Sequence, residues 1–217
     1  MKYEYIFFDL DGTLTDSQEG ILNSFRSVFQ HYGMKEPDIE TLKTFIGPPL
    51  PHTMIHGFGF PEEKVKEAIS VHRAYYNTKG YKENRVYEGI PEILKRLKEF
   101  GCKLSVATSK PEIVSKMILD HFELSKYFDF VCGSLMDESR SKKSEVISYA
   151  LQRCGLSESD KERVLMVGDR HHDIEGAQQN GLKSCGVLFG YGSRTELEDA
   201  GADYRVKDVM DLYKVIE

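Results

Sequence analysis

The chain has 217 residues, which is the length of one large domain or of one domain with a modest insertion. Its formal net charge is −6, and hydrophobic residues make up 40% and charged residues 29% of it. This composition is ordinary for a globular protein and excludes disorder as the main state. The acidic balance argues against nucleic acid or an anionic membrane surface as a general partner.

The first predicted strand, 5–9, is followed by a long helical interval. Residues 17–84 contain no apolar run of the buried-strand kind. They predict helices at 21–32, 38–45, 51–56 and 61–76, separated by glycine and proline. This interval carries as many basic as acidic residues, so the rest of the chain carries the whole net charge. We expect an all-α domain, 17–84, inserted into a domain made of residues 1–16 and 85–217.

Strands and helices alternate after the insertion. Apolar runs predict strands at 103–108, 128–133, 164–168 and 183–188, and 202–206 is a candidate edge strand. Nearly continuous apolar runs are typical of strands that are buried on both faces of a parallel sheet. Apolar residues at helical spacing predict helices at 91–100, 111–121 and 144–154. The alternation predicts a doubly wound α/β fold with a parallel sheet.

The cysteines and the apolar runs bear on the compartment. Cys102, Cys132, Cys154 and Cys185 are widely spaced and contain no CxxC pair, so we interpret them as reduced thiols and not as a zinc site. The longest apolar runs are far shorter than the ~20 residues of a membrane-spanning helix. The first residues do not have the pattern of a secretory signal. We therefore expect a cytoplasmic protein without a membrane partner.

Chemistry-bearing side chains follow the predicted strands. Asp9 and Asp11 follow the first strand, Thr108 ends the second, and Asp169 and Asp173 follow the fourth. In open α/β sheets, ligands bind beyond the carboxyl ends of the strands. These side chains are therefore expected on one rim of the sheet.

The same rim receives basic side chains. Lys110 follows Thr108, and Arg140, Lys142 and Lys143 follow the third strand. Clustered carboxylates repel one another, and a divalent cation relieves that repulsion. An all-oxygen ligand set favours Mg²⁺ over Zn²⁺. Carboxylates, Mg²⁺ and an anion-binding lysine together predict phosphoryl transfer, in which a carboxylate is a competent nucleophile.

Four segments resemble the motifs of the haloacid dehalogenase (HAD) superfamily, in the right order and at the right spacing. Asp9-Leu10-Asp11-Gly12-Thr13-Leu14-Thr15-Asp16-Ser17 resembles the first motif, and the strand that ends at Thr108 resembles the second. Lys143, at a helix start, resembles the third, and Gly168-Asp169-Arg170-His171-His172-Asp173 resembles the fourth. The resemblance covers essentially the whole chain.

The helical insertion is similar to the α-helical cap of this family. Ile46-Gly47-Pro48-Pro49-Leu50 and Gly190-Tyr191-Gly192 resemble its phosphoglycolate phosphatase-like branch. The resemblance implies a Rossmann-like catalytic core, 1–16 and 85–217, with a cap at 17–84. It implies an Mg²⁺-dependent phosphatase that hydrolyses a small phosphate monoester through an aspartyl-phosphate intermediate.

Carried over residue by residue, the resemblance implies a catalytic set. Asp9 is the nucleophile, and Asp11 is the general acid and base. Asp9, the backbone carbonyl of Asp11, and Asp169 ligate Mg²⁺, and Asp173 does so directly or through water. Thr108 donates to a phosphoryl oxygen.

The resemblance also implies a substrate-binding set. Lys143 neutralises charge on Asp9 and on the phosphoryl group, with Lys110, Arg140 and Lys142 as alternatives. The backbone at Gly12 cradles phosphoryl oxygens, together with Thr108 and Ser109. Gly47 and Pro48 are the candidates for the cap loop that faces the substrate.

Four histidines are candidates for metal ligation by spacing. His52 and His56 are spaced as residues i and i+4, but no third ligand is evident, so we interpret them as exposed or packing residues. His171 and His172 lie inside the fourth motif. We interpret them as facing solvent or supporting other residues, and we do not expect them to bind a metal directly.

The substrate stays open. Phosphoglycolate, a nucleoside monophosphate, pyrophosphate and a sugar phosphate are candidates, so a 5'-nucleotidase or a pyrophosphatase of the same family is an alternative. A phosphosugar mutase is another, although Thr13 stands where the mutase motif usually has an apolar residue. A catalytically silent HAD-like binding protein is the alternative that is not an enzyme. We expect a small phosphorylated metabolite as partner and a monomer or homodimer.

Overall fold

The computed structural model describes residues 1–48, 50–137 and 139–217, and the chain divides into two compact units. Unit 1 contains Met1–Asp16 and Val86–Glu217, and unit 2 contains Ser17–Arg85. Pro49, in the segment that resembles the phosphoglycolate phosphatase-like branch, lies outside the described residues.

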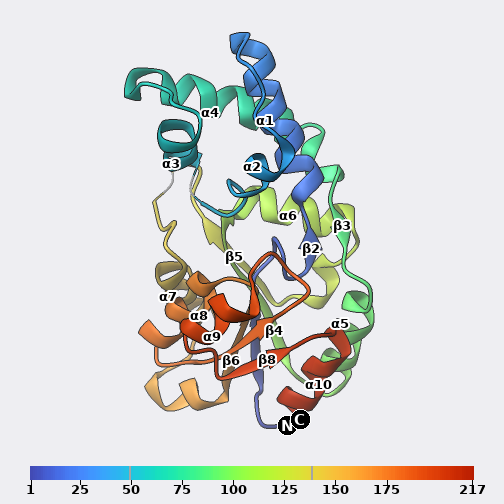
Figure 1. Ribbon diagram of the computed structural model, residues 1–217. Coiled ribbons are helices and arrows are strands. Elements are labelled where there is room, and N and C mark those ends of the chain that lie inside the picture. The colour runs from blue at the N-terminus through green and yellow to red at the C-terminus, as the bar shows by residue number, and fades with distance from the viewer. Residues whose placement is uncertain (49, 138) are drawn as a thin grey trace. The chain divides into compact units, whose positions relative to one another are not determined.

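Unit 1 is built on a six-stranded parallel sheet with the strand order β5-β4-β1-β6-β7-β8 (Figure 1). The strands are β1 (Tyr5–Phe8), β4 (Lys103–Pro111), β5 (Phe130–Ser134), β6 (Val164–Gly168), β7 (Lys183–Val187) and β8 (Tyr204–Val206). The predicted doubly wound parallel sheet is thereby confirmed. The bounds differ by two or three residues at some ends, because apolar content does not mark where the ladder of hydrogen bonds stops.

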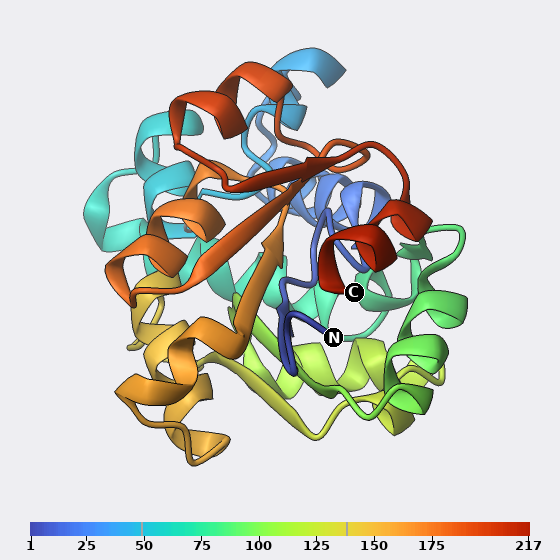
Figure 2. The ribbon, with the colours of Figure 1, turned by 90° about the horizontal axis from the view of Figure 1, so that it is seen from below.

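Helices cover both faces of this sheet. Figure 2 shows α7 and α8 on one side and α5 and α10 on the other. The helices of unit 1 are α5 (Ile90–Glu99), α6 (Glu112–His121), α7 (Lys143–Arg153), α8 (His171–Gln179), α9 (Arg194–Asp199) and α10 (Leu212–Ile216). Short 3₁₀ helices lie at Ser125–Tyr127, Glu158–Arg163 and Val209–Asp211.

The core explains the apolar runs of the sequence. Phe7 in β1 is fully buried and packs with Val146 and Ile147 of α7 and with Ala177 of α8. All five residues of β6 are buried as well. A strand with helices on both faces has no solvent side, so it has no reason to alternate polar and apolar residues.

Three helices of unit 1 were not predicted. They are α8, α9 and α10, of which α9 and α10 are only six and five residues long. The buried face of α8 is made largely of small or polar residues, with Ile174 as its one large apolar side chain. A short helix with few large apolar residues gives little periodic signal.

Unit 2 is helical, as expected. It contains α1 (Gln18–Tyr32), α2 (Ile39–Lys43), α3 (Leu50–His52), a π-helical turn (Thr53–Gly57), α4 (Glu62–Tyr76) and a 3₁₀ turn (Gly80–Lys82). The predicted helix at 51–56 is in fact the end of α3 followed by the π-helical turn. Strands β2 (Thr15–Asp16) and β3 (Arg85–Val86) pair where the chain passes from one unit to the other.

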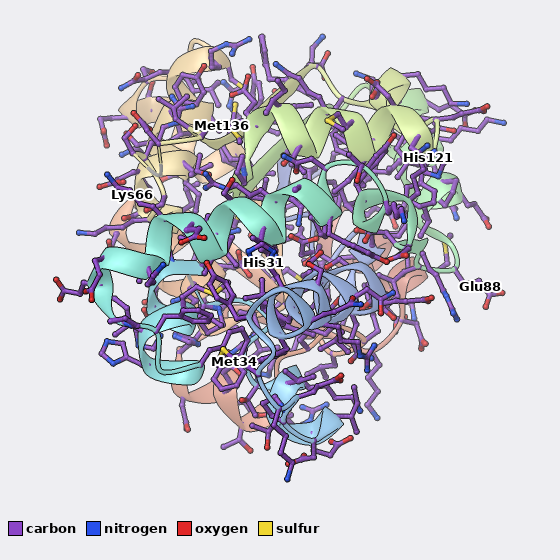
Figure 3. The ribbon with its side chains drawn as sticks, turned by 90° about the horizontal axis from the view of Figure 1, so that it is seen from above. His31, Met34, Lys66, Glu88, His121 and Met136 are labelled. Carbon is purple, nitrogen blue, oxygen red and sulfur yellow. The ribbon has the colours of Figure 1, made fainter. Side chains whose placement is uncertain are left out.

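Aromatic rings fill the interior of unit 2. Phe58 lies 5.1 Å from Phe25, 4.6 Å from Phe29 and 5.2 Å from Phe45, measured between ring centroids. Side chains such as His31 and Met34 mark the C-terminal end of α1 in this unit (Figure 3). The phenylalanine cluster is the hydrophobic core that closes α1 against α4 and the π-helical turn.

All four cysteines are free thiols; Cys102, Cys132 and Cys185 are buried and Cys154 is partly buried. Within the described parts of the chain, no helix is long and apolar enough to cross a membrane.

Candidate active site

The carboxyl ends of three neighbouring strands define one site in unit 1. Asp9 directly follows β1, Asp169 directly follows β6, and Thr108 lies near the end of β4. From β1 the chain builds β4 and β5 on one side and β6, β7 and β8 on the other. The end of β1 is therefore a topological switch point, which is where open α/β sheets bind their ligands.

Lys143 holds two of the acids together. Its Nζ lies 2.7 Å from Asp9 Oδ1 and 2.8 Å from Asp173 Oδ1, and it donates a hydrogen bond of 3.2 Å to the carbonyl oxygen of Ala107. The Lys143 side chain is 5% exposed, so these contacts replace water around the ammonium group. Lys143 is the first residue of α7, and the helix start aims the side chain at the rim.

The other basic candidates lie elsewhere. Arg140 donates to the carbonyl oxygen of Gly133, and its guanidinium lies 3.7 Å from the centre of the Tyr149 ring. Lys142 is exposed at the residue before α7. Lys110 Nζ lies 2.7 Å from Asp11 Oδ2 instead. Two lysines therefore contact the acids of the site. Lys143 lies beside Asp9 and Asp173, whereas Lys110 lies beside Asp11.

Three buried carboxylates form the centre of the site. Asp9, Asp169 and Asp173 each offer an oxygen, and these oxygens lie within 4.8 Å of one another. The three residues are 8%, 0% and 1% exposed, respectively. Acids at that separation in a dry environment repel one another strongly.

The repulsion and the burial appear in the pKa values. Burial raises the pKa of Asp9 to about 6, although Lys143 and a hydrogen bond from Thr108 act in the opposite direction. Burial, and next the charges of Asp173 and Asp9, raise the pKa of Asp169 to about 8. Lys143 is desolvated too, but Asp173 and Asp9 outweigh this and raise the pKa of its ammonium group. Without a further cation, the cluster resists full ionisation.

A divalent cation fits this donor set. Asp9, Asp11, Asp169 and Asp173 face only Lys110 and Lys143 among the ion pairs described for them, which leaves two negative charges in formal excess. Carboxylate oxygens without nitrogen or sulfur neighbours are the ligands that Mg²⁺ prefers. The residues could hold Mg²⁺ between the ends of β1 and β6.

Asp169 is fixed by two contacts that the sequence did not predict. Thr13 Oγ1 donates to Asp169 Oδ1 at 3.2 Å, and the backbone N–H of Tyr191 donates to Asp169 Oδ2 at 2.8 Å. The Tyr191 hydroxyl also donates to Asp16 Oδ1 at 2.9 Å. Tyr191 thus positions an acid of the site without being part of any of the four motifs.

The glycines on either side of Tyr191 were the available signal. A Cβ at Gly190 would lie 2.2 Å from the carbonyl oxygen of Gly12, and one at Gly192 would lie 1.9 Å from that of Asp169. Only glycine lets this backbone approach so closely. From the sequence, these glycines served only as a resemblance to one branch of the family. The structure shows that they allow the backbone around Tyr191 to pass close to Gly12 and Asp169.

Asp173 is fixed from both sides. Its Oδ2 accepts from the backbone N–H of Arg170 at 3.0 Å, which caps the start of α8, and its Oδ1 faces Lys143. Both oxygens therefore have protein partners. This arrangement favours contact with a metal through water over direct ligation.

The predicted substrate-binding residues are divided between the units. Gly12 has a φ of +82°, and its N–H donates to the carbonyl oxygen of Thr15, so the chain turns back immediately after Asp11. Thr108 is buried, and Ser109 is exposed beside it. Gly47 and Pro48 lie in unit 2, so their role as substrate contacts stays a prediction.

Comparison with known proteins places these features in a family. The family model of haloacid dehalogenase-like hydrolases matches residues 6–187. The chain is 41% identical to a protein of Pseudomonas aeruginosa named 5'-nucleotidase, over 100% of this chain and 97% of that one. It is 32% identical to the pyrophosphatase PpaX of Bacillus mycoides, over 100% of this chain and 98% of that one.

Two further matches are a longer protein and a solved structure. The chain is 39% identical to the tyrosine-protein kinase PtkA of Mycobacterium tuberculosis, over 87% of this chain and 63% of that one. A crystal structure described as a predicted phosphatase from Clostridium acetobutylicum superposes with a TM-score of 0.91 at 44% identity, over 100% of this chain and 99% of that one.

Proposed function

The chain belongs to the haloacid dehalogenase-like hydrolase family, and on this basis we propose that it is an Mg²⁺-dependent phosphatase that forms an aspartyl-phosphate intermediate. The observation that carries the proposal is the placement of Lys143 between Asp9 and Asp173, at 2.7 Å and 2.8 Å. A lysine so placed offsets charge on a carboxylate nucleophile and on a phosphoryl group next to it.

The first half-reaction transfers the phosphoryl group to the enzyme. An Asp9 carboxylate oxygen attacks phosphorus, and the bond from phosphorus to the ester oxygen breaks. Asp11 gives its proton to that leaving oxygen, which departs as an alcohol. Thr108 donates a hydrogen bond to a phosphoryl oxygen, while Lys143 offsets the charge that builds up there.

The second half-reaction releases phosphate. Asp11, now a carboxylate, takes a proton from a water molecule whose oxygen attacks phosphorus. The bond from phosphorus to the Asp9 oxygen breaks, and inorganic phosphate and the free Asp9 carboxylate result. Mg²⁺ bound by Asp9 and Asp169, with the carbonyl of Asp11, would supply charge neutralisation for the phosphoryl oxygens.

A 5'-nucleotide is the first candidate substrate. The supporting observation is the 41% identity, over nearly the full length of both chains, to a protein named 5'-nucleotidase. Pyrophosphate is the second, supported by the 32% identity to PpaX. Phosphoglycolate rests on the resemblance of two short segments, 46–50 and 190–192, to one branch of the family. The kinase named PtkA is a longer protein, of which this chain matches 63%, and we do not extend its activity to this chain.

The test is phosphate release from nucleoside monophosphates, pyrophosphate, phosphoglycolate and sugar phosphates, with Mg²⁺ and with EDTA. We expect release with Mg²⁺ only, highest for a 5'-nucleotide. Asp9→Asn should lower turnover by at least about 10³-fold. Asp11→Asn should slow the second step and leave phosphorylated protein that acid quenching traps.

Two outcomes contradict this proposal. Near-wild-type turnover by Asp9→Asn rejects the aspartyl-phosphate mechanism. Absence of phosphate release from every substrate rejects the phosphatase. Movement of the phosphoryl group from one position of a phosphosugar to another would then indicate the mutase. Absence of both reactions would favour a catalytically silent binding protein.

A further inference from the structure

A second cluster of metal-ligating side chains lies on α8, outside the four acids of the active site. His171, His172 and Glu175 each offer a ligand atom, and these atoms lie within 4.8 Å of one another. The centres of the two imidazole rings are 3.7 Å apart. His171 is partly buried, and His172 and Glu175 are exposed, so an ion can reach the cluster from solvent.

Helix geometry places Glu175 beside both histidines. His171, His172 and Glu175 occupy the first, second and fifth positions of α8, so Glu175 lies one turn beyond His171 and three residues beyond His172. Consecutive residues do not face each other across a helix, so the two imidazoles approach through the orientation of their own rings. The turn is rigid at its start because Asp173 accepts from the backbone N–H of Arg170. The ligand positions therefore belong to one fixed turn and not to a mobile loop.

His171 has a carboxylate partner of the kind that ligating histidines have. Its Nδ1 lies 2.8 Å from Glu196 Oε1, which also accepts from the His171 backbone N–H at 3.0 Å and from Arg170 Nε at 2.7 Å. A carboxylate oxygen with these donors accepts from Nδ1–H, which leaves the lone pair on Nε2. Ligating histidines in proteins usually have such a carboxylate behind them, since it fixes the ring and its tautomer.

The donor set differs from that of the active site. Two imidazoles and one carboxylate suit Zn²⁺ and its neighbours Co²⁺, Ni²⁺ and Cu²⁺, whereas the all-oxygen cluster around Asp169 suits Mg²⁺. A cation at the start of a helix is opposed by the helix dipole. Glu175 supplies negative charge that offsets this, and Glu196, which also pairs with Arg170, adds a share of its own.

We propose that His171, His172 and Glu175 bind one transition-metal ion of the Zn²⁺ class at a site distinct from the Mg²⁺ site. The ion would clamp the first turn of α8, which also carries Asp173. The site is a structural one on the surface, and its existence does not depend on the proposed phosphatase reaction.

The remaining histidine pair provides an internal comparison. His52 and His56 in unit 2 have ring centres 4.6 Å apart. In the part of the chain that the structure describes, no third ligand atom joins them in a metal-binding group. We therefore expect the α8 site to bind Zn²⁺ much more tightly than the His52 and His56 pair.

The experiment is equilibrium dialysis of the full-length chain against Zn²⁺, with Mg²⁺ in large excess to occupy the acidic cluster. We expect one Zn²⁺ per chain, and binding at least about tenfold weaker in His172→Gln and in Glu175→Gln. His121→Gln, which changes an exposed histidine at the end of α6 (Figure 3), is the matched control and should bind like wild type.

A spectroscopic readout identifies the ligands independently of affinity. One equivalent of Cu²⁺, added under the same conditions, should show electron paramagnetic resonance couplings to two nitrogens, and to fewer in His172→Gln. An all-oxygen signal would place the ion in the acidic cluster and overturn the proposal. Nitrogen couplings that survive in His172→Gln but vanish in His52→Gln would overturn it as well, as would Zn²⁺ binding that none of the α8 variants weakens.

Discussion

Lys110 and Asp11 form an ion pair that lies beside the three-acid cluster. The Lys110 side chain is 10% exposed, and its Nζ is 2.7 Å from Asp11 Oδ2. The sequence offered Lys110 only as a substitute for Lys143. Its neighbour is the acid that the proposed mechanism uses to move protons, so we interpret Lys110 as a positioning residue for Asp11.

This pairing predicts an effect that depends on the leaving group. Lys110→Met should lower kcat/KM for an alkyl phosphate by about 10²-fold, because a misplaced acid protonates the leaving oxygen poorly. p-Nitrophenyl phosphate, whose leaving group needs little protonation, should lose far less. Lys116→Met, an exposed lysine on α6, is the control. Equal losses on both esters would mean that Lys110 binds the phosphoryl group instead.

Gly12 and Gly101 both have positive φ, at +82° and +85°, but their surroundings differ. A Cβ at Gly12 would lie 2.3 Å from Asp169 Oδ2, whereas a Cβ at Gly101 would have no atom within 4 Å. Each glycine-to-alanine change costs stability through the left-handed conformation. Only the change at Gly12 also displaces an acid of the site.

The two glycines therefore form a matched pair of variants. Gly101→Ala should lower the free energy of unfolding by about 1–2 kcal/mol and keep kcat. Gly12→Ala should lose more stability and also lose Mg²⁺-dependent turnover. Urea unfolding and steady-state kinetics on both variants check this. Equal kcat in the two variants would show that Asp169 tolerates the displacement.

At the scale of elements, the residues of the site lie at or near the ends of strands and the starts of helices. The acids follow β1 and β6, Thr108 lies near the end of β4, and Lys143 and Asp173 lie in the first turns of α7 and α8. The stability of the sheet therefore supports the site directly. One of its ties is Asp129, just before β5, whose Oδ2 accepts from the backbone N–H of Leu104 in β4 and from Lys98 Nζ, both at 2.9 Å.

This tie predicts a pH-dependent stability. Burial tends to raise the pKa of Asp129, but Lys98 and the Leu104 N–H outweigh it and lower the pKa below its usual value of 3.8. A lowered pKa in the folded state adds stability above that usual value, and the contribution is lost as the pH falls through the folded-state pKa. Asp129→Asn should therefore lower the free energy of unfolding by about 1 kcal/mol at pH 7 and by less in acid.

Denaturant unfolding at several pH values between neutral and strongly acidic measures this difference. Lys98→Met serves as the companion variant, because it removes the other partner of the same carboxylate and should flatten the same part of the curve. A difference between wild type and Asp129→Asn that does not change with pH would rule out the ionised carboxylate as its source.

At the scale of the whole molecule, the excess of acids predicts that folding is linked to Mg²⁺ binding. An ion that binds only the folded protein stabilises it, and at 100 times its dissociation constant Mg²⁺ adds about 2.7 kcal/mol. For a chain of this length, that corresponds to a rise in Tm of about 5–10 °C. EDTA should remove the rise.

Asp169→Asn and Asp129→Asn separate this effect from general salt effects. Asp169→Asn removes a proposed ligand and should abolish the Mg²⁺-dependent rise, while Asp129→Asn keeps the cluster and should retain it. In EDTA, at a pH above the raised Asp169 pKa of about 8, Asp169→Asn should unfold no earlier than wild type, since it removes a repelling charge. A full Mg²⁺ response in Asp169→Asn would place the ion elsewhere. Differential scanning calorimetry of wild type and both variants, with Mg²⁺ and with EDTA, measures the Tm values.

Much of the core was readable from local sequence. The apolar runs at 5–9 and 164–168 identified strands buried on both faces, and acids placed directly after them were bound to share a rim, because parallel strands end on the same edge of a sheet. The motif spacing added the family, which the comparisons show. These inferences depend on short stretches of sequence, and they do not require knowledge of which residues each stretch contacts in the fold.

Only the tertiary structure showed several of the contacts across the rim. The family resemblance already favoured Lys143 for Asp9, whereas the pairing of Lys110 with Asp11 was not predicted and depends on β4 lying next to β1 in the sheet. The contact of Tyr191 with Asp169, and the convergence of Glu196 on His171, join residues more than twenty positions apart. Local sequence determines burial and the position of a residue at a strand end, whereas contacts across the rim depend on how all the strands and helices pack together.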